Sequence, residues 1–118
     1  MENVLTGEDY RRALGKKVRL LREQHEVTQV DLASALGFKS TGTISLVENG
    51  IKGLKITSII KLARHFGIHP AVLMSPVEME KDDLKMFSDL LTLTEKRKRN
   101  PEKVKPFFTA ISRLLETA

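Results

Sequence analysis

Apolar side chains recur at helical spacing along almost the whole chain, with little of the two-residue alternation that marks a strand. Leu14, Val18 and Leu21 stand at i, i+4 and i+7, one face of a helix. Thr6 supplies a hydroxyl N-cap ahead of it, and acidic residues follow in the first turn. The other faces are expected to carry the basic residues Lys16, Lys17, Arg19 and Arg22.

Four further short helices are predicted before Ser75. One opens at Thr28, with Asp31 three residues on in the place of a capping-box acid. Glycine closes helices because it tolerates the left-handed conformation there, and proline fits a first helical position. The remaining boundaries of this kind are Gly37, Asn49–Gly50, Gly67 and His69–Pro70. The front of the chain is therefore predicted to be a compact all-α bundle of five helices.

A domain boundary is expected at Ser75–Pro76, because proline disfavours helical geometry for its predecessor. Residues 1–75 carry eleven basic and seven acidic side chains, whereas residues 76–118 carry nine and eight. The basic excess, and with it the expected binding of a polyanion, therefore belongs to the front domain.

The tail, residues 76–118, is predicted to be a C-terminal helical hairpin. Two apolar stripes at helical spacing define its helices, and Asn100–Pro101 is a cap-plus-proline start for the second. The polar run Lys96–Arg99 is expected to be a solvated loop, with DNA backbone contact as the alternative. The stripes comprise Leu84, Phe87, Leu90 and Leu91, and then Val104, Phe107, Ile111 and Leu114.

Residues 28–50 carry the pattern that points to function. Ala33 is small enough for a second helix to cross closely, and Gly37, four residues on, permits a tight turn. Ile44 and Val47 would anchor that second helix, whose other face is polar. This is the pattern of a helix-turn-helix, whose second helix lies in the major groove of DNA.

These residues resemble the phage repressor and Cro type of helix-turn-helix proteins, the XRE family. The resemblance spans Leu14 to Met74. It rests on Leu14-Gly15, Val18-Arg19 and Arg22, on Thr28-Gln29, Leu32-Ala33 and Leu36-Gly37, on Thr43-Ile44-Ser45 and Glu48-Asn49-Gly50, and on Leu62-Ala63 with Phe66-Gly67-Ile68. It implies a five-helix, lambda-repressor-like domain whose third helix reads double-stranded DNA.

The resemblance also implies roles for individual residues. The base-reading candidates are Thr41, Gly42, Thr43, Ser45 and Leu46. The phosphate-contact candidates are Gln29, Lys39, Ser40, Asn49 and Lys52. Glu48 is expected to pair with a basic residue such as Arg22 inside the domain. The chain departs from the family pattern by one extra residue in the turn around Lys39–Ser40, and by Glu26 where many relatives have glycine.

Other chemistries find little support. The chain has no cysteine, which excludes disulfides, thiolate zinc sites and cysteine nucleophiles. No glycine-rich phosphate loop or nucleophile–base–acid set is present, so neither an enzyme nor a cofactor is expected. His65 and His69 have the spacing of two metal ligands, but Gly67 and Pro70 interrupt the helix, so no metal is expected. No apolar run is long enough for a membrane span, and a cytoplasmic protein is expected.

The sequence therefore predicts a sequence-specific transcriptional regulator, a repressor acting as a homodimer through the tail stripes. Two alternatives stay open for the tail. It could simply pack onto the front domain, or it could capture a partner protein, as in an antitoxin-like regulator. The expected reading helix offers hydroxyl and methyl groups and no guanidinium, so it would read bases by modest direct contacts.

Overall fold

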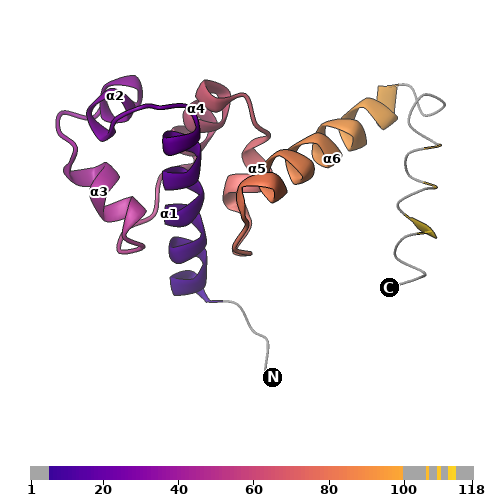
Figure 1. Cartoon of the computed structure of the whole chain (residues 1–118), viewed down its shortest axis with the longest axis horizontal. Coiled ribbons are helices and arrows are strands. Elements are labelled where there is room, and N and C mark those ends of the chain that lie inside the picture. Colours follow the sequence, from indigo (N-terminus) through magenta and orange to yellow (C-terminus); the bar gives the residue numbers. More distant parts are fainter. Residues whose placement is uncertain (1–5, 100–105, 107–108, 110–111, 114–118) are drawn as a thin grey trace.

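Helices account for the regular structure throughout the described part of the chain, as predicted. The computed structural model describes residues 6–99 together with residues 106, 109, 112 and 113. Between residues 6 and 99 it contains six helices and no strand (Figure 1). They are α1 (Gly7–Gln24), α2 (Gln29–Ala35), α3 (Gly42–Glu48), α4 (Ile56–Phe66), α5 (Pro70–Met74) and α6 (Lys81–Arg99).

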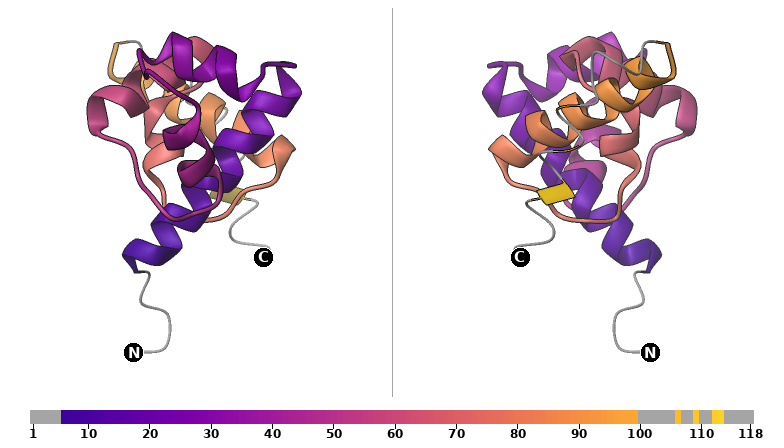
Figure 2. Two further views of the ribbon diagram at one scale, coloured as in Figure 1. Left: turned by 90° about the vertical axis from the view of Figure 1, so that its left-hand side faces the viewer. Right: turned by 90° about the vertical axis from the view of Figure 1, so that its right-hand side faces the viewer.

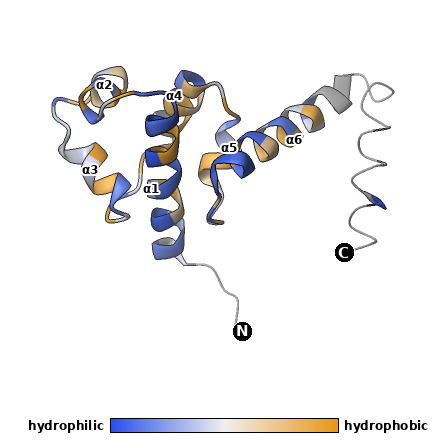
Figure 3. Cartoon of the chain, viewed as in Figure 1, coloured by the Kyte–Doolittle hydropathy of each residue, from blue (hydrophilic) through white to orange (hydrophobic). Residues whose placement is uncertain are grey.

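The helices surround one core, with α1 running through the middle of the molecule. The short helices α2 and α3 lie on one side of α1, and α6 lies on the other side and extends away from it (Figures 1 and 2). Each turn of α1 and of α6 contains both polar and apolar residues, as in helices that are partly buried and partly exposed to solvent (Figure 3). The side chains at the centre include Leu14, Val18, Leu32, Ile44, Leu62 and Leu73, all with 0% exposure.

The hydroxyl caps predicted at Thr6 and Thr28 are present, and each is part of a capping box, which the sequence predicted only for Thr28. The Thr6 hydroxyl accepts a hydrogen bond from the Asp9 N–H at 3.1 Å, and the Asp9 carboxylate accepts one from the Thr6 N–H at 2.8 Å. Thr28 and Asp31 make the same exchange at the start of α2. These contacts fix where α1 and α2 begin, because they satisfy N–H groups that have no partner within a helix.

The end of α1 uses a geometry that glycine usually supplies. The Val27 N–H donates to the Arg22 carbonyl at 2.9 Å and the Glu26 N–H to the Glu23 carbonyl at 3.1 Å, which is a Schellman closure. This closure gives Glu26 a φ of 54°, while the other described residues with positive φ are Gly37, Gly50 and Gly67. A residue with a Cβ is disfavoured there by roughly 1–2 kcal/mol, so Glu26 adopts this conformation at some cost in stability.

The expectation that Lys17 lies outside the apolar face of α1 is wrong. Its side chain has 0% exposure, because it stands one turn from both Leu14 and Leu21 and so lies on the buried stripe. Its ammonium donates hydrogen bonds to the carbonyls of Val72 at 2.9 Å and Ser75 at 2.8 Å. Burial lowers the pKa of Lys17 to about 8. A lysine therefore satisfies carbonyls at the end of α5 that the helix itself leaves without partners.

The start of the tail belongs to the same core. Met79 is 6% exposed, Leu84 1% and Ser88 6%. The Ser88 hydroxyl accepts the His69 N–H at 2.9 Å, and Glu80 pairs with Lys16 at 2.8 Å. This packing is one of the alternatives left open by the sequence, and it takes Leu84 off the surface that another molecule could reach.

The expected loop at Lys96–Arg99 is wrong, because α6 continues to Arg99. Glutamate, lysine and arginine are good helix formers, and no glycine or proline occurs between Lys81 and Arg99 to stop the helix. The apolar stripe of the second predicted hairpin helix, Val104, Phe107, Ile111 and Leu114, lies outside the described residues.

Gly15 lets α1 touch the backbone of α3. A Cβ built at Gly15 would lie 2.3 Å from the Val47 carbonyl oxygen and 2.8 Å from that of Glu48, both closer than a Cβ approaches a non-bonded atom. The obstacle is backbone, so it cannot rotate away as a flexible side chain would. The crossing of α1 and α3 therefore requires glycine at this position.

We predict that Gly15→Ala destabilises the protein, although the same change in an open helix stabilises it by roughly 0.5–1 kcal/mol. The expected loss is roughly 1–3 kcal/mol, because α3 must shift to admit the methyl group. Urea denaturation of the variant measures it. Gly7→Ala is the matched control on the same helix, since a Cβ there meets only the end of the Arg11 side chain. Equal stability of the two variants would contradict the close crossing.

Candidate nucleic-acid interface

The helix-turn-helix is formed by α2, the turn after it, and α3. Ala33 is 3% exposed at the inner side of α2, and Gly37 has a φ of 78° in the turn, both as predicted. Ile44 and Val47, each with 0% exposure, hold α3 in the core. The helix α3 is therefore anchored through one face, and its opposite face points outward.

The outward face of α3 is uncharged and consists of small or hydroxyl-bearing residues and one leucine. Gly42 and Leu46 are exposed, Leu46 to 41%, and Thr41, Thr43 and Ser45 are half-buried. Between Thr41 and Val47 the sequence contains no charged residue, asparagine or glutamine. All five base-reading candidates thus lie on α3 or at its N-cap.

The extra turn residue is accommodated before α3 begins. The Phe38 N–H donates to the Ala33 carbonyl at 2.8 Å, and the Phe38 ring packs partly buried against the core. Lys39 and Ser40 then lie exposed, and the Ser40 hydroxyl accepts from the Gly42 N–H at 3.4 Å. The insertion is confined to residues 38–41, so the helix from Gly42 to Glu48 is continuous.

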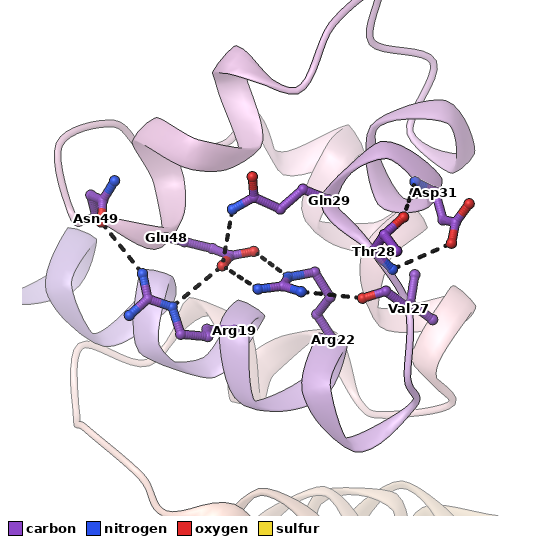
Figure 4. A network of polar contacts seen from close by, with 8 residues as sticks. All are labelled: Arg19, Arg22, Val27, Thr28, Gln29, Asp31, Glu48 and Asn49. Atoms are coloured by element: carbon purple, nitrogen blue, oxygen red, sulfur yellow. Dashed lines mark hydrogen bonds and ion pairs between the residues drawn. The ribbon is translucent and has the colours of Figure 1, made fainter.

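Glu48 is the polar centre of this region (Figure 4). Its carboxylate is 1% exposed and accepts two hydrogen bonds from Arg22, at 2.8 Å from Nε and 3.0 Å from Nη2. The expected pairing of Glu48 with Arg22 is confirmed. Arg22 also donates to the Val27 carbonyl at 3.3 Å. This one side chain of α1 therefore contacts both α3 and the loop between α1 and α2.

Two longer contacts complete the network. Arg19 Nε and Gln29 Nε2 each lie 3.4 Å from Glu48 Oε1, and Arg19 Nη2 lies 3.4 Å from the Asn49 side-chain oxygen. The phosphate candidates Gln29 and Asn49 therefore belong to one hydrogen-bonded group around Glu48. Sequence reasoning missed Arg19, although its position one turn before Arg22 places both on the same side of α1.

The pKa of Glu48 reflects a balance of burial and pairing. Burial by itself raises the pKa of the carboxyl, but the hydrogen bonds and charge of Arg22, with the hydrogen bonds of Gln29 and Arg19, bring the pKa below its ordinary value. Glu48 is therefore ionised at neutral pH, and its charge is matched within the protein.

The remaining phosphate candidate, Lys52, is exposed in the loop that follows α3. Backbone bonds fix the beginning of this loop, because the Ile51 N–H donates to the Leu46 carbonyl at 3.0 Å and Gly50 has a φ of 74°. Lys39 and Lys52 thus flank the uncharged face of α3 from its two ends.

Comparison with protein families identifies residues 18–73 as matching the helix-turn-helix family model. This match supports an XRE-type helix-turn-helix DNA-binding protein. The matched span runs from the middle of α1 to α5 and includes the whole Glu48 network. DNA binding and transcription regulation are the activities of this family. A comparison with curated proteins gives no match.

Within the described residues, no three histidine, cysteine or acidic side chains converge as metal ligands, and no helix is long and apolar enough to cross a bilayer. The His65 ring packs edge-on against the Phe66 ring, whereas the His69 ring contacts the Glu95 carboxylate on α6. The His25 Nδ1–H donates to the Leu21 carbonyl, 2.9 Å away, at the end of α1.

We predict that Glu48→Gln lowers the free energy of unfolding by about 3 kcal/mol at pH 7, because Arg22 loses its buried partner charge. Folding lowers the pKa of Glu48, so its ionised form stabilises the protein above the unfolded-state value of about 4.3. This contribution disappears as the pH falls through the folded-state pKa.

Denaturation at pH 7 and at acidic pH measures both effects. The difference between wild type and Glu48→Gln should shrink on acidification. Glu78→Gln, which changes an exposed carboxylate, is the control and should follow the wild type at each pH. A constant difference between wild type and Glu48→Gln across the titration would contradict the assignment.

Proposed function

We propose that this protein is a cytoplasmic, non-enzymatic transcriptional repressor that binds a specific double-stranded DNA site as a homodimer. The observation that carries the proposal is the exposed face of α3, held rigidly by Glu48 and flanked by lysines. An α-helix fits the major groove, where bases can be told apart. Occupancy of the site by the protein would then exclude other proteins from it.

Phosphate contacts are assigned to the residues around α3. Lys39 and Lys52 supply charge, and Gln29, Ser40 and Asn49 supply hydrogen-bonding groups. Contacts of this kind position a protein on the duplex without reading its sequence. Because the Glu48 network ties Gln29 and Asn49 to the core, these two groups would meet the backbone at a fixed spacing.

Base contacts are assigned to Thr41, Gly42, Thr43, Ser45 and Leu46. Gly42 lets the DNA approach the helix closely, since it has no side chain. The hydroxyl groups can donate to or accept from any base edge, so they discriminate modestly. DNA shape and backbone contacts would supply further selectivity.

The dimer contact is assigned to α6, on the side of the molecule away from α3 (Figure 1). An apolar groove runs between α5 and α6, lined by Ala71, Val77, Phe87, Leu90 and Leu91 among others. Phe87 is 39% exposed and the adjacent Met86 50%. A second copy is the occupant we propose, because two-fold symmetry sets two α3 helices on half-sites about 34 Å apart. Val104, Phe107, Ile111 and Leu114 stay predicted contributors to this interface.

We predict that binding to duplex DNA weakens linearly in log K with log salt concentration, since lysine contacts release counterions. Lys52→Ala should reduce the magnitude of that slope by about one and weaken all sequences alike. Fluorescence anisotropy with a duplex selected from a random pool measures this. Lys85→Ala is the control, because the Lys85 side chain is exposed on α6, and this variant should keep the wild-type slope. Binding that ignores salt, or shows no preferred duplex, would refute the proposed function.

We predict that Phe87→Glu converts a dimer into a monomer in sedimentation velocity, because the charge would be buried in the apolar contact. Lys81→Glu, exposed in the first turn of α6, is the control and should remain dimeric. Truncation after Ser75 is a poor alternative, since Met79 and Leu84 are in the core. A monomeric wild type would contradict the assigned dimer.

A further inference from the structure

Leu46 is an unusual residue for a helix that contacts DNA bases, because most base contacts are made by polar or charged side chains. It is an apolar residue, 41% exposed, on the outward row of α3 that also contains Gly42, Ser45 and Asn49. The opposite row, Ile44, Val47 and Glu48, is buried. The core therefore does not account for a leucine at this position.

The local geometry presents the Leu46 side chain to the surface of the helix. A helical leucine leans toward the N-terminus and covers the turn before its own Cα. For Leu46 that turn is the one containing Gly42, which has no side chain to compete for the surface. The Leu46 backbone is fixed, because its carbonyl accepts N–H groups from Ile51 at 3.0 Å and Lys52 at 3.3 Å.

The major groove offers one apolar feature among its base edges, the 5-methyl group of thymine. A leucine against the polar edges of the other bases would strip them of water and return no hydrogen bond. Against a thymine methyl the same leucine buries apolar surface on both partners. Leu46 thus favours one base and disfavours the others through a single contact.

We propose that this protein reads its DNA site through thymine 5-methyl groups, with Leu46 as the residue that determines this specificity. The inference rests on the proposed function and adds the chemical group that is read. It requires A·T pairs opposite α3, with the thymine methyl facing Leu46. Thr41 and Thr43 carry methyl groups on the same helix and can extend the contact.

The test replaces thymine by deoxyuracil, which removes the methyl group and keeps the base pair and its hydrogen-bonding groups. The probe is the duplex that the full-length protein selects from a random pool, with each thymine replaced in turn. Loss of one buried methyl should weaken wild-type binding about fourfold at the contacted position. The other positions should bind unchanged.

Leu46→Ala identifies the residue responsible. This variant should bind the thymine and deoxyuracil duplexes equally at the contacted position. Leu46→Ala and the deoxyuracil replacement together should therefore weaken binding no more than one of them does alone. Ile60→Ala is the matched control, because Ile60 lies on α4 and is 40% exposed, much as Leu46 is. It should retain the full penalty for deoxyuracil, and circular dichroism should show all three proteins folded.

Two results would overturn the inference while leaving the proposed function intact. One is tight binding of every deoxyuracil duplex by the wild type, and the other is a penalty that persists unchanged in Leu46→Ala. Failure to select any duplex at all would instead refute sequence-specific binding, and the inference with it. The deoxyuracil series on the wild type gives an answer even if Leu46→Ala does not fold.

Discussion

The buried carboxylate of Glu48 is the interaction on which the DNA-binding region depends. A charge with 1% exposure is tolerable only when it is fully partnered, and Arg22 meets it with two hydrogen bonds. Because Arg22 comes from α1, Gln29 from α2 and Glu48 from α3, the pairing sets the relative placement of all three. The helix α3 is held by the contact of Glu48 with Arg22 at its C-terminal end and by Ile44 and Val47 along its inner face.

A steric constraint acts at the same place. Gly15 allows α1 to approach the carbonyls of Val47 and Glu48, and this closeness brings Arg19 and Arg22 within reach of the carboxylate. Packing and charge therefore support each other. An added methyl at Gly15 would displace α3 and lengthen the ion pairs of Glu48 with Arg19 and Arg22. It would therefore weaken these ion pairs as well as the packing of α1 on α3.

A second set of polar contacts joins the tail to the front helices. Lys17 binds the end of α5, Lys16 pairs with Glu80, and His69 donates to Ser88. The His69 contact connects α6 to the start of α5, the Lys16 contact connects α1 to the residue before α6, and the Lys17 contacts connect α1 to the end of α5. Of these helices, α1 also packs against α3. The second subunit proposed for α6 would thus be connected to α3 through packed helices.

Local signals in the sequence determined the front of this fold. The capping pairs Thr6–Asp9 and Thr28–Asp31 and the glycines at 37, 50 and 67 act within a few residues, so their consequences were readable without the structure. Tertiary structure decided what depends on distant partners. Lys17 lies on the buried stripe of α1, and its ammonium is satisfied there by carbonyls more than fifty residues away. Leu84 is buried because the first turns of α6 pack against the core. Glu48 was expected to be paired, but Arg19, Gln29 and Asn49 joined its network through helix crossings that no local pattern encodes.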